Sequence, residues 1–172
     1  KKQELNRVDS LFAEMLEQYP QEEPVHRLFG MYLSSRKDFS RAEEQYAIAA
    51  DLAPTNPENW LQLIGLYLYQ EKYAEVIRVG KRAIQYVPDQ KDIYMYVAVA
   101  SAQTKSYDEA LSMLETGLNY VEENDAGTKS FFYGQMGDVY HSAGDKEKSY
   151  EMYEKALSYN ASNLSLIHIS EP

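Results

Sequence analysis

The sequence repeats itself every 34 residues, and this period restricts the possible folds more than any other feature of the chain. The stretch "HRLFGMYLSSRKDFSRAEEQYAIAADLAP" from His26 aligns without a gap to "WLQLIGLYLYQEKYAEVIRVGKRAIQYVP" from Trp60, so that Pro54 and Pro88 lie 34 residues apart. A third copy starts at Tyr94. A fourth copy follows after five additional residues, "DAGTK". Apolar residues at helical spacing within such a period are typical of helical hairpins that stack on one another.

These copies divide the chain into four predicted repeats and a preceding half. The predicted segments are 1–22 (second helix of a truncated preceding repeat), 23–56, 57–90, 91–124 and 130–163, with an insertion at 125–129. Turn signals such as "KDF", "EKY", "KSY" and "GDK" recur at one phase of the repeat. We expect an all-α chain with breaks near 20–24, 36–39, 53–57, 70–73, 87–91, 104–107, 121–128 and 143–146.

Residues at fixed phases resemble the signature of the tetratricopeptide repeat family, W-x2-L-G-x2-Y followed by Ala, an aromatic residue, Ala and Pro. First-helix matches are Trp60, Leu63 and Tyr67, Phe29 and Gly30, and Met136, Gly137 and Tyr140; second-helix matches are Ala42, Tyr46, Ala49 and Pro54, Ala83 and Pro88, Ala110, and Tyr153 and Ala156. Phe12, Met15 and Pro20 continue the pattern in the leading half-repeat. The resemblance covers residues 1 to 163 and implies a right-handed helix-turn-helix solenoid that serves protein–protein interaction.

The second and third repeats depart from this signature at the helix crossing. Ile64 and Val76 occupy two positions where small residues are expected, and Gly80 replaces the aromatic residue. In the third repeat, Leu114 occupies the aromatic position and Gly117 a small one. Cores tolerate such changes when the total volume is kept, so we expect large and small side chains to have been exchanged across these contacts.

Charge and composition restrict the partners. The formal net charge is −10, from 27 acidic and 17 basic residues, without a local Lys/Arg cluster, which argues against nucleic acid and against anionic membrane surfaces. No stretch of about 18 apolar residues predicts a membrane span. The chain has no Cys. Both cytoplasmic and periplasmic or envelope proteins can lack it, so localisation stays open.

Catalytic chemistry is sparse in this sequence. His26 and His141 lie three repeats apart and cannot share a ligand, and no phosphate-binding loop, metalloprotease or nucleophile motif is present. The acidic "EENDAGTK" stretch lacks the alternating ligands of a calcium loop. We therefore expect no catalytic residue, no cofactor and no metal site.

A concave groove lined by the first helix of each repeat is the predicted binding site. Repeat phase places on it Arg27, Met31, Ser34, Ser35, Leu61, Gly65, Leu68, Tyr69, Met95, Val99, Ala102, Gln103, Asp138, His141 and Ser142. Family members that clamp acidic tails carry Lys, Asn and Arg at these phases, and only Arg27 fits that pattern here. The apolar middle of the groove instead suits an apolar, neutral-to-basic peptide or protein. Alternatively, these side chains contact further repeats of the same protein.

Two other functions stay open at this point. The repeats could be the regulatory arm of a sensor, DNA-binding protein or enzyme whose other domain is missing, or they could belong to a cell-envelope assembly or secretion factor. The tail "LSLIHISEP" (164–172) does not continue the repeat. It resembles a translated sequencing adapter, one frame of CTG TCT CTT ATA CAC ATC TCC GAG CCC. We expect this segment to be non-native and the chain to be a fragment cut at both ends.

Overall fold

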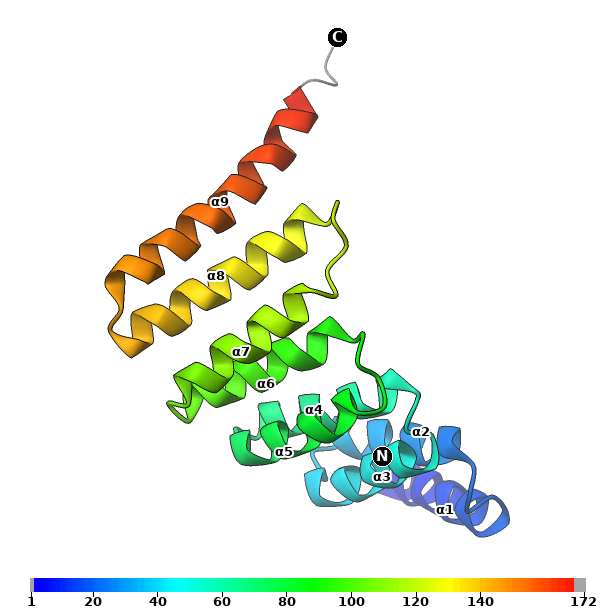
Figure 1. Cartoon of the computed structure of the whole chain (residues 1–172). Helices are drawn as coiled ribbons and strands as arrows, with labels where there is room; N and C mark the ends of the chain where they lie inside the picture. The colour runs from blue at the N-terminus through cyan, green and yellow to red at the C-terminus, as the bar shows by residue number, and fades with distance from the viewer. Residues whose placement is uncertain (1, 169–172) are drawn as a thin grey trace. The chain divides into compact units, whose positions relative to one another are not determined.

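The computed structural model describes the backbone of residues 2–168 and the side chains of residues 7–159 (Figure 1). Within this part of the chain every regular element is an α-helix and no strand occurs. The helices are α1 (Lys2–Gln18), α2 (Glu23–Ser35), α3 (Phe39–Leu52), α4 (Pro57–Tyr69), α5 (Tyr73–Ile84), α6 (Lys91–Gln103), α7 (Tyr107–Leu118), α8 (Ala126–Ala143) and α9 (Lys146–His168). The prediction of an all-α helical repeat is confirmed.

The connections between these helices lie in or next to the predicted breaks, and local chemistry explains several of the boundaries. Asn56 caps α4, its side-chain oxygen accepting a hydrogen bond from the Glu58 backbone N–H at 3.2 Å, and Pro57 fills the first helical position. In the insertion, Asp125 accepts a hydrogen bond from the Thr128 backbone N–H at 2.9 Å and so begins α8. The acidic stretch before the fourth repeat therefore contains a helix cap.

The turn inside each predicted repeat contains one residue in the left-handed backbone region. These residues are Lys37 (φ 63°), Glu71 (φ 55°), Lys105 (φ 62°) and Gly144 (φ 86°). They occupy the same repeat phase, and only the fourth repeat supplies glycine, which adopts this conformation without a steric penalty. The shared turn geometry follows the period of the sequence although the residue type changes.

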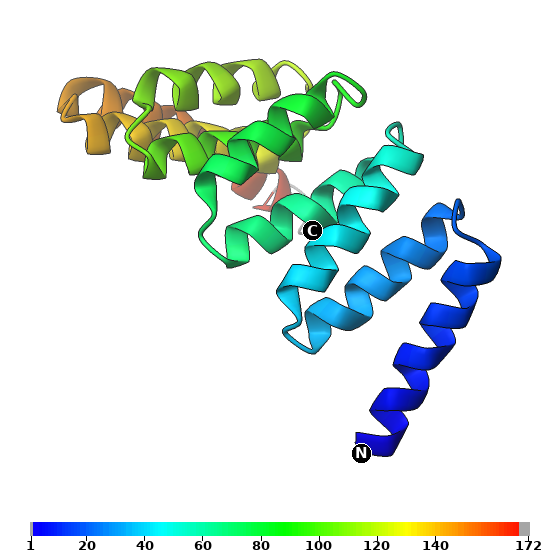
Figure 2. The ribbon, with the colours of Figure 1, turned by 90° about the horizontal axis from the view of Figure 1, so that it is seen from below.

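The chain comprises two compact units, Lys1–Glu71 and Lys72–Pro172, which are described separately. In the first unit α1 to α4 lie side by side in chain order (Figure 2). Phe12 of α1 stacks on Phe29 of α2, with ring centroids 4.6 Å apart. Gly30 lies where α2 crosses α3, because a Cβ atom there would stand 2.7 Å from the ring of Tyr46. Through these contacts α2 packs against both α1 and α3.

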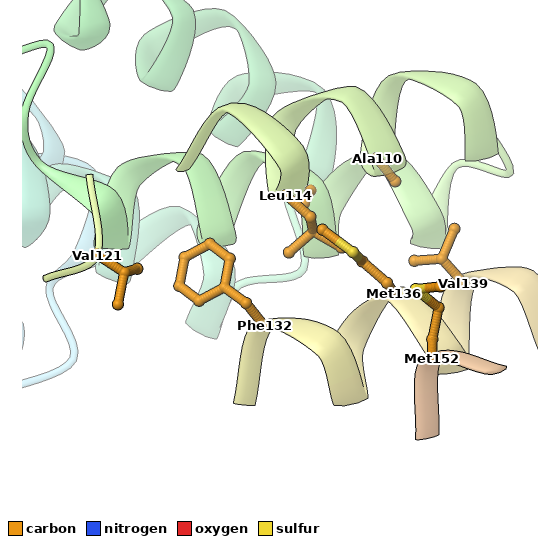
Figure 3. Close-up of a cluster of buried hydrophobic side chains, with 8 residues drawn as sticks. Ala110, Leu114, Val121, Phe132, Met136, Val139 and Met152 are labelled. Carbon is orange, nitrogen blue, oxygen red and sulfur yellow. The ribbon is translucent and has the colours of Figure 1, made fainter. Parts of the chain in front are cut away.

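The second unit contains α5 to α9, and α7 and α8 share a buried hydrophobic cluster. Leu114 of α7 and Phe132, Met136 and Val139 of α8 are buried, and their side chains meet between the two helices (Figure 3). Gly137 lies against the ring of Tyr153 in α9, and a Cβ atom there would stand 2.5 Å from that ring. The large–small pairing of Gly30 with Tyr46 thus recurs at the crossing of α8 and α9.

A hydrogen bond from the start of the first helix to the preceding proline recurs in three repeats. His26 Nε2, Trp60 Nε1 and the Tyr94 hydroxyl each donate to a proline carbonyl six residues earlier, at 3.1, 2.7 and 2.8 Å, respectively. The acceptors are Pro20, Pro54 and Pro88. Three different side chains therefore satisfy one recurring carbonyl, which explains why an aromatic or imidazole ring recurs at this phase.

The predicted non-native segment 164–172 falls only partly within the described part of the chain. The backbone of α9 continues through His168, so the helix includes the first residues of that segment without a break. Residues 169–172, and all side chains from residue 160 onward, lie outside the described residues.

A candidate peptide groove on the inner helices

A hollow of about 180 Å³ lies between α6 and α8 in the second unit. Its lining residues come from three consecutive helices: Ala98, Val99, Ala102 and Gln103 of α6, Leu114 of α7, and Gln135, Asp138, Val139 and Ser142 of α8. In both α6 and α8 these residues recur at spacings of three or four, so the helical period of 3.6 residues places them on one side of the helix. The hollow thus forms where α6, α7 and α8 meet.

The floor of this hollow is apolar and its rim is polar. Ala98, Leu114 and Val139 are buried, being 1%, 1% and 5% exposed, and they belong to the hydrophobic core of the unit. Gln103 and Asp138 are exposed at the rim, one on each side. An apolar group that enters the hollow would therefore contact buried carbon atoms while its flanking polar atoms meet an amide and a carboxylate.

The carboxylate at the rim is held in place by two neutral donors. The Tyr153 hydroxyl of α9 donates to Asp138 at 2.7 Å, and Gln135 Nε2 donates to the same carboxylate at 3.3 Å. The hydrogen bond to Asp138 raises the pKa of the Tyr153 hydroxyl above its ordinary value. Because Tyr153 also packs on Gly137, the crossing of α8 and α9 fixes the position of the Asp138 carboxylate.

The structure brings together part of the predicted groove in this unit. Val99, Gln103 and Asp138 line the hollow, together with Ala102 and Ser142. Repeat phase alone predicts these five residues to share one face. Their convergence follows from the similar placement of equivalent helices in stacked repeats, which the five-residue insertion before the fourth repeat does not disrupt.

Two residues of this unit that were predicted to line the groove lie outside the hollow. Met95 is half-buried and packs against the hydrophobic core, one helical turn before Val99. His141 lines a separate hollow of about 300 Å³ with Lys146, Ser149, Tyr150 and Tyr153. At about 100° per residue, His141 points toward α9 whereas Ser142 points toward α6, so neighbours in sequence face different helices.

The predicted groove residues of the first unit are on α2 and α4, and most are accessible. Met31 is 43% exposed and Tyr69 is 66% exposed, with the Tyr69 ring tilted against Phe39 at a centroid distance of 5.3 Å. Leu61 and Leu68 are half-buried, and Gly65 is exposed with open space where a Cβ atom would be. Arg27 forms an ion pair with Glu23 at 2.9 Å.

Repeat phase alone missed several residues of these surfaces. Leu28 is 47% exposed beside Met31, and Gln135 lines the hollow in the second unit. Leu28 and Gln135 occupy the same position of their repeats, allowing for the insertion, so extending the predicted face by one helical position would have included both. Leu114 and Val139 gave no such signal, because a core residue at the floor of a hollow has the same sequence pattern as any other core residue.

The part of the chain that the structure describes contains no group of three or more His, Cys, Asp or Glu side chains that could hold a metal ion. Asp125 of the acidic junction instead accepts the hydrogen bond from Thr128, which holds the pKa of its carboxyl below the ordinary value. Among the same residues, no helix combines the length and apolarity needed to cross a membrane.

Comparison with known proteins identifies a family for this chain. The profile of a family described as "Tetratricopeptide repeat" matches residues 7–169. A TPR repeat-containing protein of Methanocaldococcus jannaschii is 26% identical over 101 residues, which is 58% of this chain and 17% of that protein. The chain thus matches about a sixth of that relative's length.

Solved structures resemble the fold over most of the chain. A crystal structure of MamA superposes with a TM-score of 0.75 at 16% identity and covers 95% of this chain and 93% of that one. MamA from Desulfovibrio magneticus RS-1 gives a TM-score of 0.72 at 12% identity, with 92% and 86% covered. BtubC from P. vanneervenii gives 0.70 at 18% identity, with 100% and 78% covered. At these identities the likeness establishes the fold alone.

Proposed function

This chain belongs to the tetratricopeptide repeat family, and on that premise we propose that it is a non-catalytic scaffold that binds a peptide or partner protein on the inner faces of its first helices. These helices are α2, α4, α6 and α8. The hollow between α6 and α8 carries the proposal, because residues placed on the inner face by repeat phase line it together with buried apolar side chains. Such a surface suits a polypeptide that inserts side chains.

The size of the hollow favours a side chain over a small molecule. Pockets for cofactors and drug-sized ligands measure about 300–1,000 Å³ and enclose most of the bound molecule. The hollow between α6 and α8 measures about 180 Å³. It would accept part of an extended chain, with the rest of the partner lying across the rim.

The accessible apolar residues of the first unit support a partner with apolar character. Leu28, Met31 and Tyr69 are 47%, 43% and 66% exposed. Their exposed area is apolar surface that a bound partner can remove from water. The net charge of −10 favours encounter with neutral or basic partners over acidic ones.

A random-peptide display library panned against the full chain tests this proposal. The test compares the wild type with the double variant Leu68→Asp/Val99→Asp, which places a charge on the inner face of each unit. Leu157→Asp is the matched control, because Leu157 is 66% exposed on the second helix of its hairpin. Circular dichroism confirms that all proteins remain helical before panning.

We expect the wild type and Leu157→Asp to enrich the same apolar, Lys- or Arg-containing peptides, and the double variant to lose them. Enrichment of the same peptides by the double variant would show that another surface binds them. That result would overturn the assignment of binding to the inner faces.

A further inference from the structure

We propose that the hollow between α6 and α8 is a subsite for one aliphatic side chain next to a Lys or Arg residue of the bound polypeptide. This inference rests on the proposed function and specifies the partner's chemistry at one place. It assigns the aliphatic side chain to the buried floor and the cation to Asp138. The family's clamp for acidic tails has the opposite charge preference.

The floor selects an aliphatic group because it contains no polar side-chain atom. Leu114 and Val139 close it from below, and Val99 and Ala102 form one wall. Leu114 and Val139 are also fixed by the core, so the floor exists before a partner arrives (Figure 3). Burying a hydroxyl or carboxylate of the partner there would cost its hydration without a compensating hydrogen bond.

The rim selects a cation because its only charged side chain is Asp138. This carboxylate accepts hydrogen bonds from the Tyr153 hydroxyl and the Gln135 amide, which are neutral donors and do not neutralise its negative charge. Across the hollow Gln103 contributes only a neutral amide. The hydrogen bonds hold the carboxylate in one orientation, which lowers the entropic cost of pairing with a Lys or Arg of the partner.

The exposure of Asp138 determines how strongly the hollow should prefer a Lys-containing peptide over a Glu-containing one. Asp138 is solvent-exposed, and exposed ion pairs contribute modestly. A Lys-containing peptide should therefore bind about two- to five-fold tighter than its Glu-containing counterpart at low ionic strength. The preference should shrink as salt screens the pair, while the contribution of the aliphatic group should persist.

Three capped peptides are the probes: acetyl-Gly-Lys-Val-Lys-Gly-amide, the same sequence with Glu in place of both Lys, and the first sequence with Ser in place of Val. Each is titrated into the full chain while two-dimensional amide NMR spectra report which residues respond. We expect the Lys-Val-Lys peptide to perturb the amides of Val99, Gln103, Asp138 and Ser142. We expect the Glu-Val-Glu and Lys-Ser-Lys peptides to bind more weakly at the same residues.

Two variants of Asp138 separate charge from structure. Asp138→Asn keeps an oxygen that can accept the Tyr153 hydrogen bond and should reduce the preference for Lys over Glu to the weak one that the net negative charge of the chain produces. Asp138→Lys should reverse it. Glu115→Gln is the control, because it removes one negative charge from an exposed position on α7 and should leave the preference unchanged.

A preference for Lys that is as large in Asp138→Asn as in the wild type would overturn the inference, as would amide changes confined to residues outside the hollow. Equal binding of the Val and Ser peptides would also overturn it. If display peptides still depended on Leu68 and Val99 in these cases, the scaffold proposal would stand and only the subsite would be wrong. If that dependence were also absent, both proposals would fail.

Discussion

Replacing Gly30 or Gly65 by alanine should change the stability of the first unit in opposite directions. Both glycines lie inside helices, where alanine is favoured over glycine by about 0.8–1 kcal/mol. At Gly65 no atom lies within 4 Å of the position that a Cβ atom would occupy. The whole propensity gain should therefore appear, and Gly65→Ala should stabilise the protein by about 1 kcal/mol.

At Gly30 the same substitution meets a packed ring. A Cβ atom would stand 2.7 Å from Cδ1 and Cε1 of Tyr46, and that ring is 2% exposed and cannot move toward solvent. Overpacking of this kind costs about 1–3 kcal/mol. After the propensity gain, Gly30→Ala should destabilise the protein by about 0–2 kcal/mol. The difference between the two variants isolates the packing cost, about 1–3 kcal/mol.

Urea unfolding followed by far-ultraviolet circular dichroism measures this difference, provided that both variants keep the wild-type dependence on urea. The pair Gly137 and Gly134 repeats the test in the second unit. A Cβ atom at Gly137 would stand 2.5 Å from the Tyr153 ring, whereas a Cβ atom at Gly134 would have no atom within 4 Å. Equal stabilities for Gly30→Ala and Gly65→Ala would refute the reasoning. It would mean that Gly30 does not lie at a close helix crossing and that the repeat register is wrong.

Three further predictions concern side chains that complete the repeat. Asn59→Ala should destabilise by about 1–3 kcal/mol in chemical unfolding, because the buried amide donates to two backbone carbonyls at the end of α3, at 3.1 and 3.4 Å; an unchanged midpoint would exclude this capping role. Gly144→Ala should cost about 1–2 kcal/mol at its φ of 86°, and a stability equal to wild type would contradict the left-handed turn. Hydrogen bonds from Lys81 and Ser101 hold the pKa of Glu109 below its ordinary value of 4.5. The stability that the Lys81–Glu109 pair contributes is therefore present above pH 4.5 and is lost as the pH falls through the lowered pKa. Lys81→Met should flatten the acid limb of the stability–pH curve, and identical limbs for wild type and variant would argue against the pair.

The period of the sequence was sufficient to predict the helices and most of their ends. Helix formation and helix ending depend on local patterns: apolar spacing, caps such as Asn56, and turn residues that recur with the repeat. The shared face of α6 and α8 followed from repeat phase once the five-residue insertion was allowed for, because stacked repeats place equivalent residues side by side. Val99, Gln103 and Asp138 therefore could be predicted to lie together without coordinates.

Side-chain direction within one helix turn was beyond the reach of repeat phase. Met95 and Val99 share a face by spacing, yet Met95 packs against the core while Val99 lines the hollow. His141 and Ser142 are adjacent and face different helices. The separation depends on which neighbouring side chains fill the space at each turn, and a repeat signature does not encode that choice.

The sequence by itself determined that successive helical hairpins would form, because helix period, turns and caps act between residues close in the chain. The tertiary structure decided which large side chain fills the space beside each glycine at a helix crossing. The sequence predicts that Gly80 leaves space for a large side chain of its own repeat. Gly80 instead lies against Val97 of α6, the first helix of the following repeat, and a Cβ atom at Gly80 would stand 2.3 Å from Cγ2 of that valine. Gly117 likewise makes room for Phe132 and Tyr94. Close packing lets any neighbouring side chain fill a vacant volume, so these partners are fixed only when the helices meet.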